Sequence, residues 1–153
     1  MKVNTRIFGE IDIDDSKIIT FENGIIGFSD LKKFALIFDS EKKNKGGISW
    51  LQSLEDGNMA LPVLDPLIVK PDYSPYIEDE MLNALGKCED EDYLVLVTVT
   101  VPSDIKKITV NLKAPIIINT LTLKANQIIS ENEEYLIKFP IYDIIKNGSG
   151  EGR

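Results

Sequence analysis

The sequence of 153 residues contains no histidine, one cysteine and one tryptophan. Histidine is the commonest general base and metal ligand in proteins, so its absence excludes a Ser–His–Asp triad or a Cys–His pair within this chain. The lone Cys88 excludes an internal disulfide and fits a reducing compartment. Four acidic residues follow it directly, and their charge disfavours a reactive thiolate.

Long apolar runs are also missing. No stretch approaches the roughly 20 residues that a membrane helix requires, and the N-terminus reads as a strand rather than as a signal peptide. We therefore expect a cytoplasmic protein without membrane association. The length predicts a single domain whose core needs no disulfide or metal to stabilise it.

Basic residues are outnumbered, with 17 lysines and arginines against 25 acidic residues and a net charge of −8. Such a surface repels phosphate backbones, so we expect no direct binding of nucleic acid. It attracts a basic protein partner and speeds its association. Lys42, Lys43 and Lys45 form the one obvious lysine cluster, in segment 41–47 (EKKNKGG), which we expect to be an exposed mobile loop.

What the sequence has is alternating β-branched residues. The clearest pattern lies in 93–119, where one strand runs from Tyr93 to Val101, Pro102 breaks it, and alternation resumes at Ile108. We expect further short strands, with a hairpin turn at 55–58. They are predicted near 3–7, 11–13, 18–21, 34–38, 50–54, 59–64, 121–123, 127–129 and 135–139.

Many short strands at close spacing favour a closed or nearly closed sheet. The predicted fold class is therefore all-β and mainly antiparallel, a small barrel-like domain with one or two short helices. Residues 1–146 form this single binding domain, and residues 147–153 have nothing to bury and are expected to be a flexible tail.

One segment reads clearly as a helix. Ser74 is a suitable N-cap, Pro75 suits the first helical position and Gly86 can end the helix. Between them lies an apolar stripe at helical spacing, with acidic residues in the first turns. We also expect a short helix or turn at 141–146, a helical turn from Ser29 to Lys33, and an extended chain at Pro62, Pro66 and Pro71.

Acidic clusters and aromatic residues are the candidates for function. The acidic runs 12–15 and 89–92 lack the loop spacing of a calcium site, so solvated acidic faces are the better interpretation, and we predict no metal and no cofactor. Aromatic residues are favoured at protein interfaces, although core packing is the alternative. The candidate partner-binding residues are Tyr73, Tyr76, Glu78, Asp79 and Glu80, with strand edges at Ile48–Trp50 or Asn111–Ala114 as the opposing possibility.

Several short motifs together resemble the bacterial flagellar assembly factor FliW family. They occur in the same order over about residues 1–144. The turn before Gln127 departs from the family, because Asn126 stands where glycine is often found. Asparagine tolerates the left-handed conformation, so we expect the hairpin to be retained. The motifs are FENGIIGF at 21–28, WLQS at 50–53, PDY at 71–73 and TVNLKAPI at 109–116, with Asn119 and Gln127 downstream.

The resemblance implies a small antiparallel barrel-like fold without enzymatic activity. It also implies that the protein binds flagellin in the cytoplasm and keeps it soluble. We expect the free protein to be a monomer. A second implied partner is the translational regulator CsrA, whose repression of flagellin mRNA the protein would relieve without occupying the RNA site. Flagellin would compete for the protein and so control its own translation.

Two other functions stay open at this point. A small carboxylate-based hydrolase would need a concave pocket with two carboxylates at a suitable separation. An oligonucleotide-binding barrel would need basic residues clustered beside aromatic rings on one face.

Overall fold

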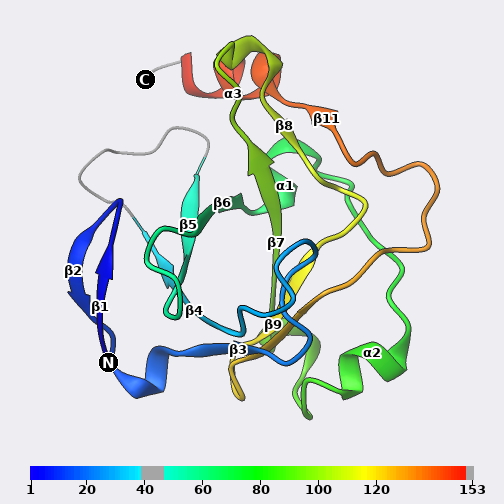
Figure 1. Ribbon diagram of the computed structural model, residues 1–153. Coiled ribbons are helices and arrows are strands. Elements are labelled where there is room, and N and C mark those ends of the chain that lie inside the picture. The colour runs from blue at the N-terminus through cyan, green and yellow to red at the C-terminus, as the bar shows by residue number, and fades with distance from the viewer. Residues whose placement is uncertain (39–46, 151–153) are drawn as a thin grey trace.

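The computed structural model describes residues 1–38 and 47–150, with side chains up to residue 146. Its main feature is a closed barrel, in which β7 pairs with β9 and completes the ring β7-β6-β5-β4-β3-β10-β9 (Figure 1). All neighbours are antiparallel except β3 and β10, so the predicted all-β, mainly antiparallel class is confirmed. The barrel strands are β3 (Ile19–Phe21), β4 (Lys33–Ile37), β5 (Ser49–Ser53), β6 (Ala60–Leu64), β7 (Tyr93–Thr100), β9 (Ile116–Asn119) and β10 (Lys124–Gln127).

Short elements surround the barrel. The hairpin of β1 (Lys2–Thr5) and β2 (Gly9–Asp12) lies beside the β5–β6 turn, where Arg6 N–H donates to Gly57 O at 3.0 Å. Strands β8 (Thr109–Val110) and β11 (Phe139–Pro140) extend the sheet at one end of β7. The helices are α1 (Pro66–Val69), α2 (Asp79–Asn83), α3 (Tyr142–Gly150) and the 3-10 turns η1 (Asp15–Lys17), η3 (Asp90–Asp92) and η4 (Ile105–Lys107).

Strand β7 lies between two hydrophobic cores, because its successive side chains point to opposite faces. Leu96 faces the barrel interior, where Phe21 and Phe34 pack edge to face with ring centroids 5.3 Å apart. Val97 and Val99 face the other way, into a core that α1 and α3 help to cover. The strand is therefore apolar on both faces, as its sequence pattern indicates.

The two strands predicted on either side of Pro102 pair as a hairpin, and β7 also takes a second partner. Its last residues pair with β8 in the register Val99↔Val110. Its first half pairs with β9, from Tyr93↔Asn119 onward, and this pairing closes the barrel. One long strand thus belongs to both the hairpin and the barrel seam.

The predicted strand at 121–123 is wrong, because this segment is the β9–β10 turn. The side-chain carbonyl of Asn119 accepts N–H groups of Leu121 and Thr122 at 2.9 and 3.1 Å and bends the chain there. Leu123 has a φ of 60°, whereas Asn126 lies inside β10. The left-handed position of this hairpin is therefore Leu123 and not Asn126. The strands predicted at 127–129 and 135–139 are likewise displaced or shorter, since β10 ends at 127 and β11 begins at 139.

The predicted helix from Ser74 to Gly86 is also too long. The N–H groups of Ser74 and Tyr76 donate to Tyr135 and Asn132, at 2.8 and 2.6 Å, and hold the chain extended. Helix α2 consequently begins at Asp79, with Glu78 as its N-cap.

Of three further expectations, the structure contradicts two and confirms one. The extended chain predicted at Pro66 is wrong, because Asp65 caps α1 by accepting Leu67 N–H at 2.9 Å. The helical turn from Ser29 to Lys33 is also wrong, because Lys33 pairs with Thr20 in β4. The C-terminal helix is confirmed as α3.

Two predicted segments, the tail at 147–153 and the loop at 41–47, lie partly outside the described residues. Helix α3 runs through 147–150, the first part of the predicted tail, whose flexibility stays a prediction. Most of the predicted loop 41–47 lies outside the described residues. No helix of the described residues is long and apolar enough to cross a membrane.

Candidate partner-binding surfaces

The two tyrosines of the predicted surface have opposite environments. Tyr73 is only 7% exposed, its hydroxyl donates to Leu112 O at 2.7 Å, and its ring lies 4.6 Å from that of Tyr135. Burial, and to a lesser extent Tyr135, raises the pKa of the Tyr73 hydroxyl well above its usual value. Tyr76 is 58% exposed. Tyr73 therefore serves the core, and Tyr76 is the residue of this pair that a partner can reach.

The acidic residues predicted near these tyrosines face solvent. Glu78, Asp79 and Glu80 are all exposed at the start of α2. The other side of the helix packs on the outside of the barrel, where Leu82 joins a cluster with Ile117. In Figure 1, α2 lies at the lower right, away from α3. The helix is thus anchored by its apolar side and presents its carboxylates outward.

Ile48 and Trp50 lie elsewhere. Both are half-buried, and the Trp50 ring meets Phe8 edge to face, with centroids 6.3 Å apart. Strand β5 is at the left of Figure 1, across the barrel from α2, so the predicted residues do not form one surface. The opposing possibility, Asn111–Ala114, forms a turn in which the Asn111 side chain accepts the N–H of Ala114 at 3.0 Å.

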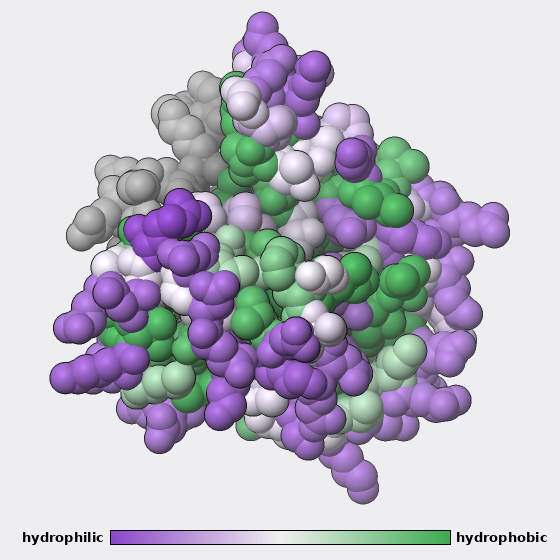
Figure 2. Space-filling model, in the orientation of Figure 1, coloured by the Kyte–Doolittle hydropathy of each residue, from purple (hydrophilic) through white to green (hydrophobic). Residues whose placement is uncertain are grey.

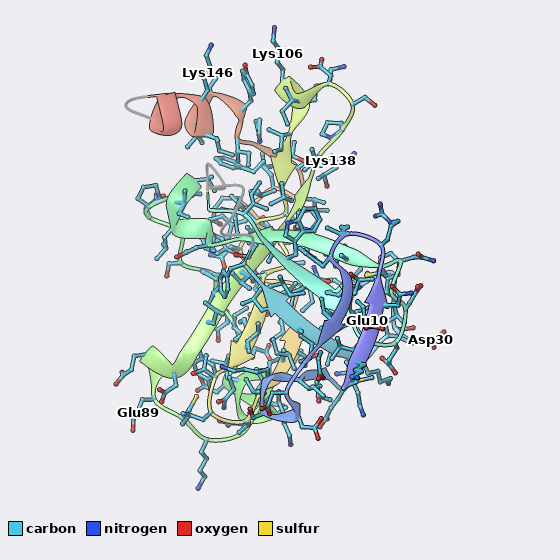
Figure 3. All side chains as sticks on the ribbon, turned by 90° about the vertical axis from the view of Figure 1, so that its left-hand side faces the viewer. Glu10, Asp30, Glu89, Lys106, Lys138 and Lys146 are labelled. Atoms are coloured by element: carbon cyan, nitrogen blue, oxygen red, sulfur yellow. The ribbon has the colours of Figure 1, made fainter. Side chains whose placement is uncertain are left out.

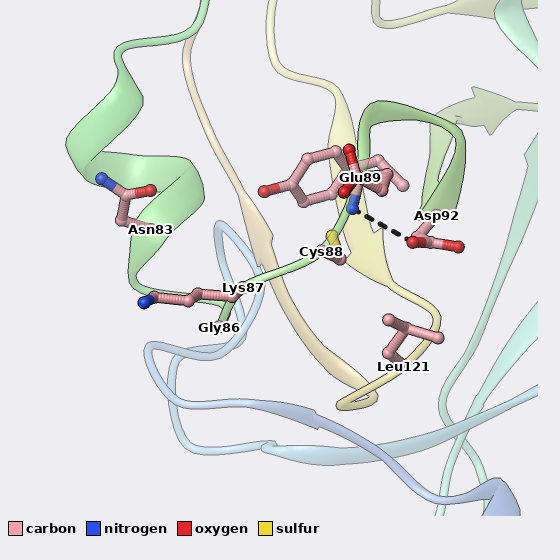
Figure 4. Close-up of a pocket in the computed structure, with 8 residues that line it drawn as sticks. Asn83, Gly86, Lys87, Cys88, Glu89, Asp92 and Leu121 are labelled. Carbon is pink, nitrogen blue, oxygen red and sulfur yellow. Dashed lines mark hydrogen bonds between the residues drawn. The ribbon is translucent and has the colours of Figure 1, made fainter.

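A hollow of about 460 Å³ lies between α2 and η3 (Figure 4). It contains two carboxylates, and that of Asp92 accepts Glu89 N–H at 3.1 Å and so helps to cap η3. Cys88 is half-buried beside Tyr93. Burial is the main cause that raises the pKa of Tyr93, followed by Cys88. Within the described part of the chain, no three acidic or cysteine side chains are placed to hold a metal ion.

The structure collects lysines that are far apart in the sequence. Figure 3 shows Lys106, Lys138 and Lys146 at one end of the molecule, with Glu89 toward the other. The Lys146 ammonium lies 5.8 Å from the Tyr142 ring centroid, so this end combines positive charge with an aromatic face. The group is not visible in the sequence because its members come from η4, α3 and the segment before β11, which the β8–β11 pairing brings together.

One face of the molecule exposes apolar side chains. Figure 2 shows them at the centre and right, over the β3–β4 connection and the segment that follows β10. The connection is held there because Gln127 accepts Ile26 N–H at 2.9 Å. Grouped apolar exposure of this kind is typical of interaction surfaces. The exposed large apolar residues of these two segments are Ile26, Phe28, Ile129, Leu136 and Ile137.

Comparison with known proteins agrees with this architecture. The family model described as FliW protein matches residues 2–141. The flagellar assembly factor FliW of Lachnospira eligens is 50% identical over 95% of this chain and 97% of its own length. That of Lachnoclostridium phytofermentans is 45% identical, with coverage of 96% and 94%.

A solved structure shows the same fold. The crystal structure of a flagellar assembly factor FliW superimposes with a TM-score of 0.84 at 29% identity, over 93% of this chain and 97% of that one. The sequence match and the shared barrel both extend over nearly the whole chain. The chain therefore belongs to the FliW protein family.

Proposed function

We propose that this protein is a flagellar assembly factor that acts in the cytoplasm by binding other proteins. One partner is flagellin, which it holds soluble before export. The other is the translational regulator CsrA, whose repression of flagellin mRNA it relieves. The observation that carries this proposal is the match of residues 2–141 to the FliW protein family, whose members in Lachnospira eligens and Lachnoclostridium phytofermentans are named flagellar assembly factors.

The charge distribution supports a basic partner at the α2 end. Helix α2 and η3 present acidic side chains outward, and Glu78, Asp79 and Glu80 follow one another at the helix start. An RNA-binding regulator offers positive charge, and complementary charge directs encounter and fixes orientation. We therefore assign the regulator to this surface, which we call the acidic end and define by Glu78, Asp79, Glu80 and η3.

A charge-reversal series tests the assignment. The variant in which Glu78, Asp79 and Glu80 are all changed to Lys should bind purified CsrA at least about tenfold more weakly, mainly through slower association. A matched control changes Glu10, Asp30 and Glu133 to Lys, three exposed acids outside the acidic end. It alters the net charge equally and should bind nearly as well as the wild type. Surface plasmon resonance at several salt concentrations measures both.

The regulatory part of the proposal needs its own measurement. Purified flagellin should form a complex with the protein in size-exclusion chromatography, where the free protein elutes as a monomer. Added flagellin should also release CsrA from the protein and restore CsrA binding to flagellin mRNA. Failure of both partners to bind the wild-type protein would contradict the proposed function.

A further inference from the structure

Strand β7 has an open backbone edge along its first half. The carbonyls of Asp92 and Thr98 point toward β9 and β8, where each accepts a backbone N–H, at 2.9 and 3.0 Å. Residues of odd number therefore point their backbone groups to the opposite side, toward β6. Pairing with β6 ends at Leu64↔Val97. Within residues 1–38 and 47–150, no group pairs with the N–H or C=O of Val95 on that side.

The sequence explains why β6 stops there. Continued in the same register, the next hydrogen-bonded position opposite Val95 would be Pro66, which has no N–H to give. The preceding Asp65 accepts Leu67 N–H and starts α1 instead. The dipeptide Asp65-Pro66 thus turns the chain away and leaves the backbone edge of Tyr93–Leu96 without a paired strand among the described residues, although backbone groups in proteins normally find a hydrogen-bonding partner. We call these four residues the β7 edge.

Two apolar hollows lie on either side of the β7 edge. The outer one, about 240 Å³, is lined by Pro66, Leu67, Tyr93 and Val95. The other measures about 380 Å³ and is lined by Ile19, Leu36, Leu94 and Leu121 of the barrel, with Lys17 also in its lining. Successive side chains of a strand point to opposite faces, so a strand added here would place alternate residues in the two hollows.

Negative charge gathers at the Tyr93 end of the edge. There η3 supplies Asp90, Glu91 and Asp92 immediately before the strand. Helix α2 also packs beside Tyr93 through Leu82, and the first turn of this helix carries Asp79. A segment that continued the course of β6 would run antiparallel to β7 and bring its C-terminal end to these carboxylates.

We propose that the β7 edge binds an extended segment of a protein partner as an added antiparallel strand. The segment has apolar residues that fill the two hollows and basic residues at its C-terminal end. Backbone hydrogen bonds to Val95 align it, and the hollows select its side chains. This inference rests on the proposed function, because it specifies how a protein partner is held.

Synthetic peptides test the inference on the full-length protein. The probe is a short fluorescent Val–Leu repeat with two C-terminal lysines, and its control ends in two glutamates. Fluorescence anisotropy should show at least about tenfold tighter binding of the lysine peptide. N-methylation of one alternating set of residues should abolish binding, while methylation of the other set should leave it, because only one set faces the β7 edge.

Two variants locate the site. Val95→Pro removes the free N–H without taking a bond from the β9 ladder, and should weaken the lysine peptide at least about tenfold. Leu67→Glu changes a 52% exposed residue of the outer hollow and should weaken it similarly even if the proline variant folds poorly. The matched control Ile105→Glu alters a 50% exposed residue in η4 and should bind as the wild type does.

The outcomes separate clearly. Equal binding of both methylated peptides, or wild-type affinity of Leu67→Glu, would overturn the added-strand model. Neither result would bear on whether flagellin or CsrA binds, because that binding is measured with the whole partner proteins. Conversely, peptide binding at the β7 edge without binding of either whole partner would contradict the proposed function alone.

Discussion

At the scale of single residues, Tyr73 and Tyr76 show how neighbours in sequence acquire different roles. They bracket Ser74-Pro75, and sequence pattern gives both the same potential as interface aromatics. The Tyr73 hydroxyl is committed to Leu112 O, which ties the 71–76 loop to the turn after β8. Tyr76 uses only its backbone, through Asn132, and leaves its ring to solvent.

Tyr73→Phe should therefore lower the free energy of unfolding by about 1–2 kcal/mol, because the buried Leu112 carbonyl loses its donor. The conservative control Tyr76→Phe removes an exposed hydroxyl and should change stability by less than about 0.5 kcal/mol. Urea unfolding followed by circular dichroism measures both. Equal stability of the two variants would show that the Tyr73 hydroxyl does not stabilise the fold. A loss of partner affinity in Tyr73→Phe alone would show that this hydroxyl belongs to the binding surface.

At the scale of elements, the sequence predicted what depends on local pattern. The alternation from Tyr93 to Thr100 is strong enough to define β7, and Asp56-Gly57 marks the β5–β6 turn. The limits of α2 were missed because Asn132 and Tyr135, more than fifty residues away, hold the chain before it.

The surfaces were harder to predict than the strands. The acidic start of α2 is visible in the sequence because its members are consecutive. The lysine end, formed by Lys106, Lys138 and Lys146, and the β7 edge depend on which strands pair and in which register, and no local sequence pattern indicates that. The signal that could have revealed the edge is Asp65-Pro66, since a capping residue followed by proline begins a helix.

Asn119 of β9 connects its own strand to the segment after α2 and to the β9–β10 turn. Its substitution is therefore expected to have the largest effect on stability at this scale. Its side-chain nitrogen donates to Leu85 O and Gly86 O at 3.0 and 3.2 Å, while its oxygen holds the β9–β10 turn. Asn119→Ala should lower stability by about 2–4 kcal/mol, because several buried partners are left unsatisfied. Amide hydrogen exchange of this variant should show the earliest loss of protection in the segment after α2. Asn58→Ala, an exposed asparagine, is the control and should be nearly neutral.

At the scale of the whole molecule, charge is unevenly spread. The net charge of −8 coexists with an end where Lys106, Lys138 and Lys146 lie together, opposite the acidic end. Lysines beside aromatic rings are what an oligonucleotide-binding barrel requires. The overall field of the protein opposes that role, since it repels a phosphate backbone at long range.

These opposing features predict that the protein does not bind single-stranded RNA directly. Fluorescence anisotropy with labelled flagellin leader RNA should show only weak binding at low salt, abolished near physiological ionic strength. The variant with Lys106, Lys138 and Lys146 changed to Glu should leave the affinity for CsrA intact, because these lysines lie away from the acidic end. Tight RNA binding that this variant lost, with a steep dependence on salt, would instead assign the lysine end to phosphate contacts and make the protein an RNA-binding barrel.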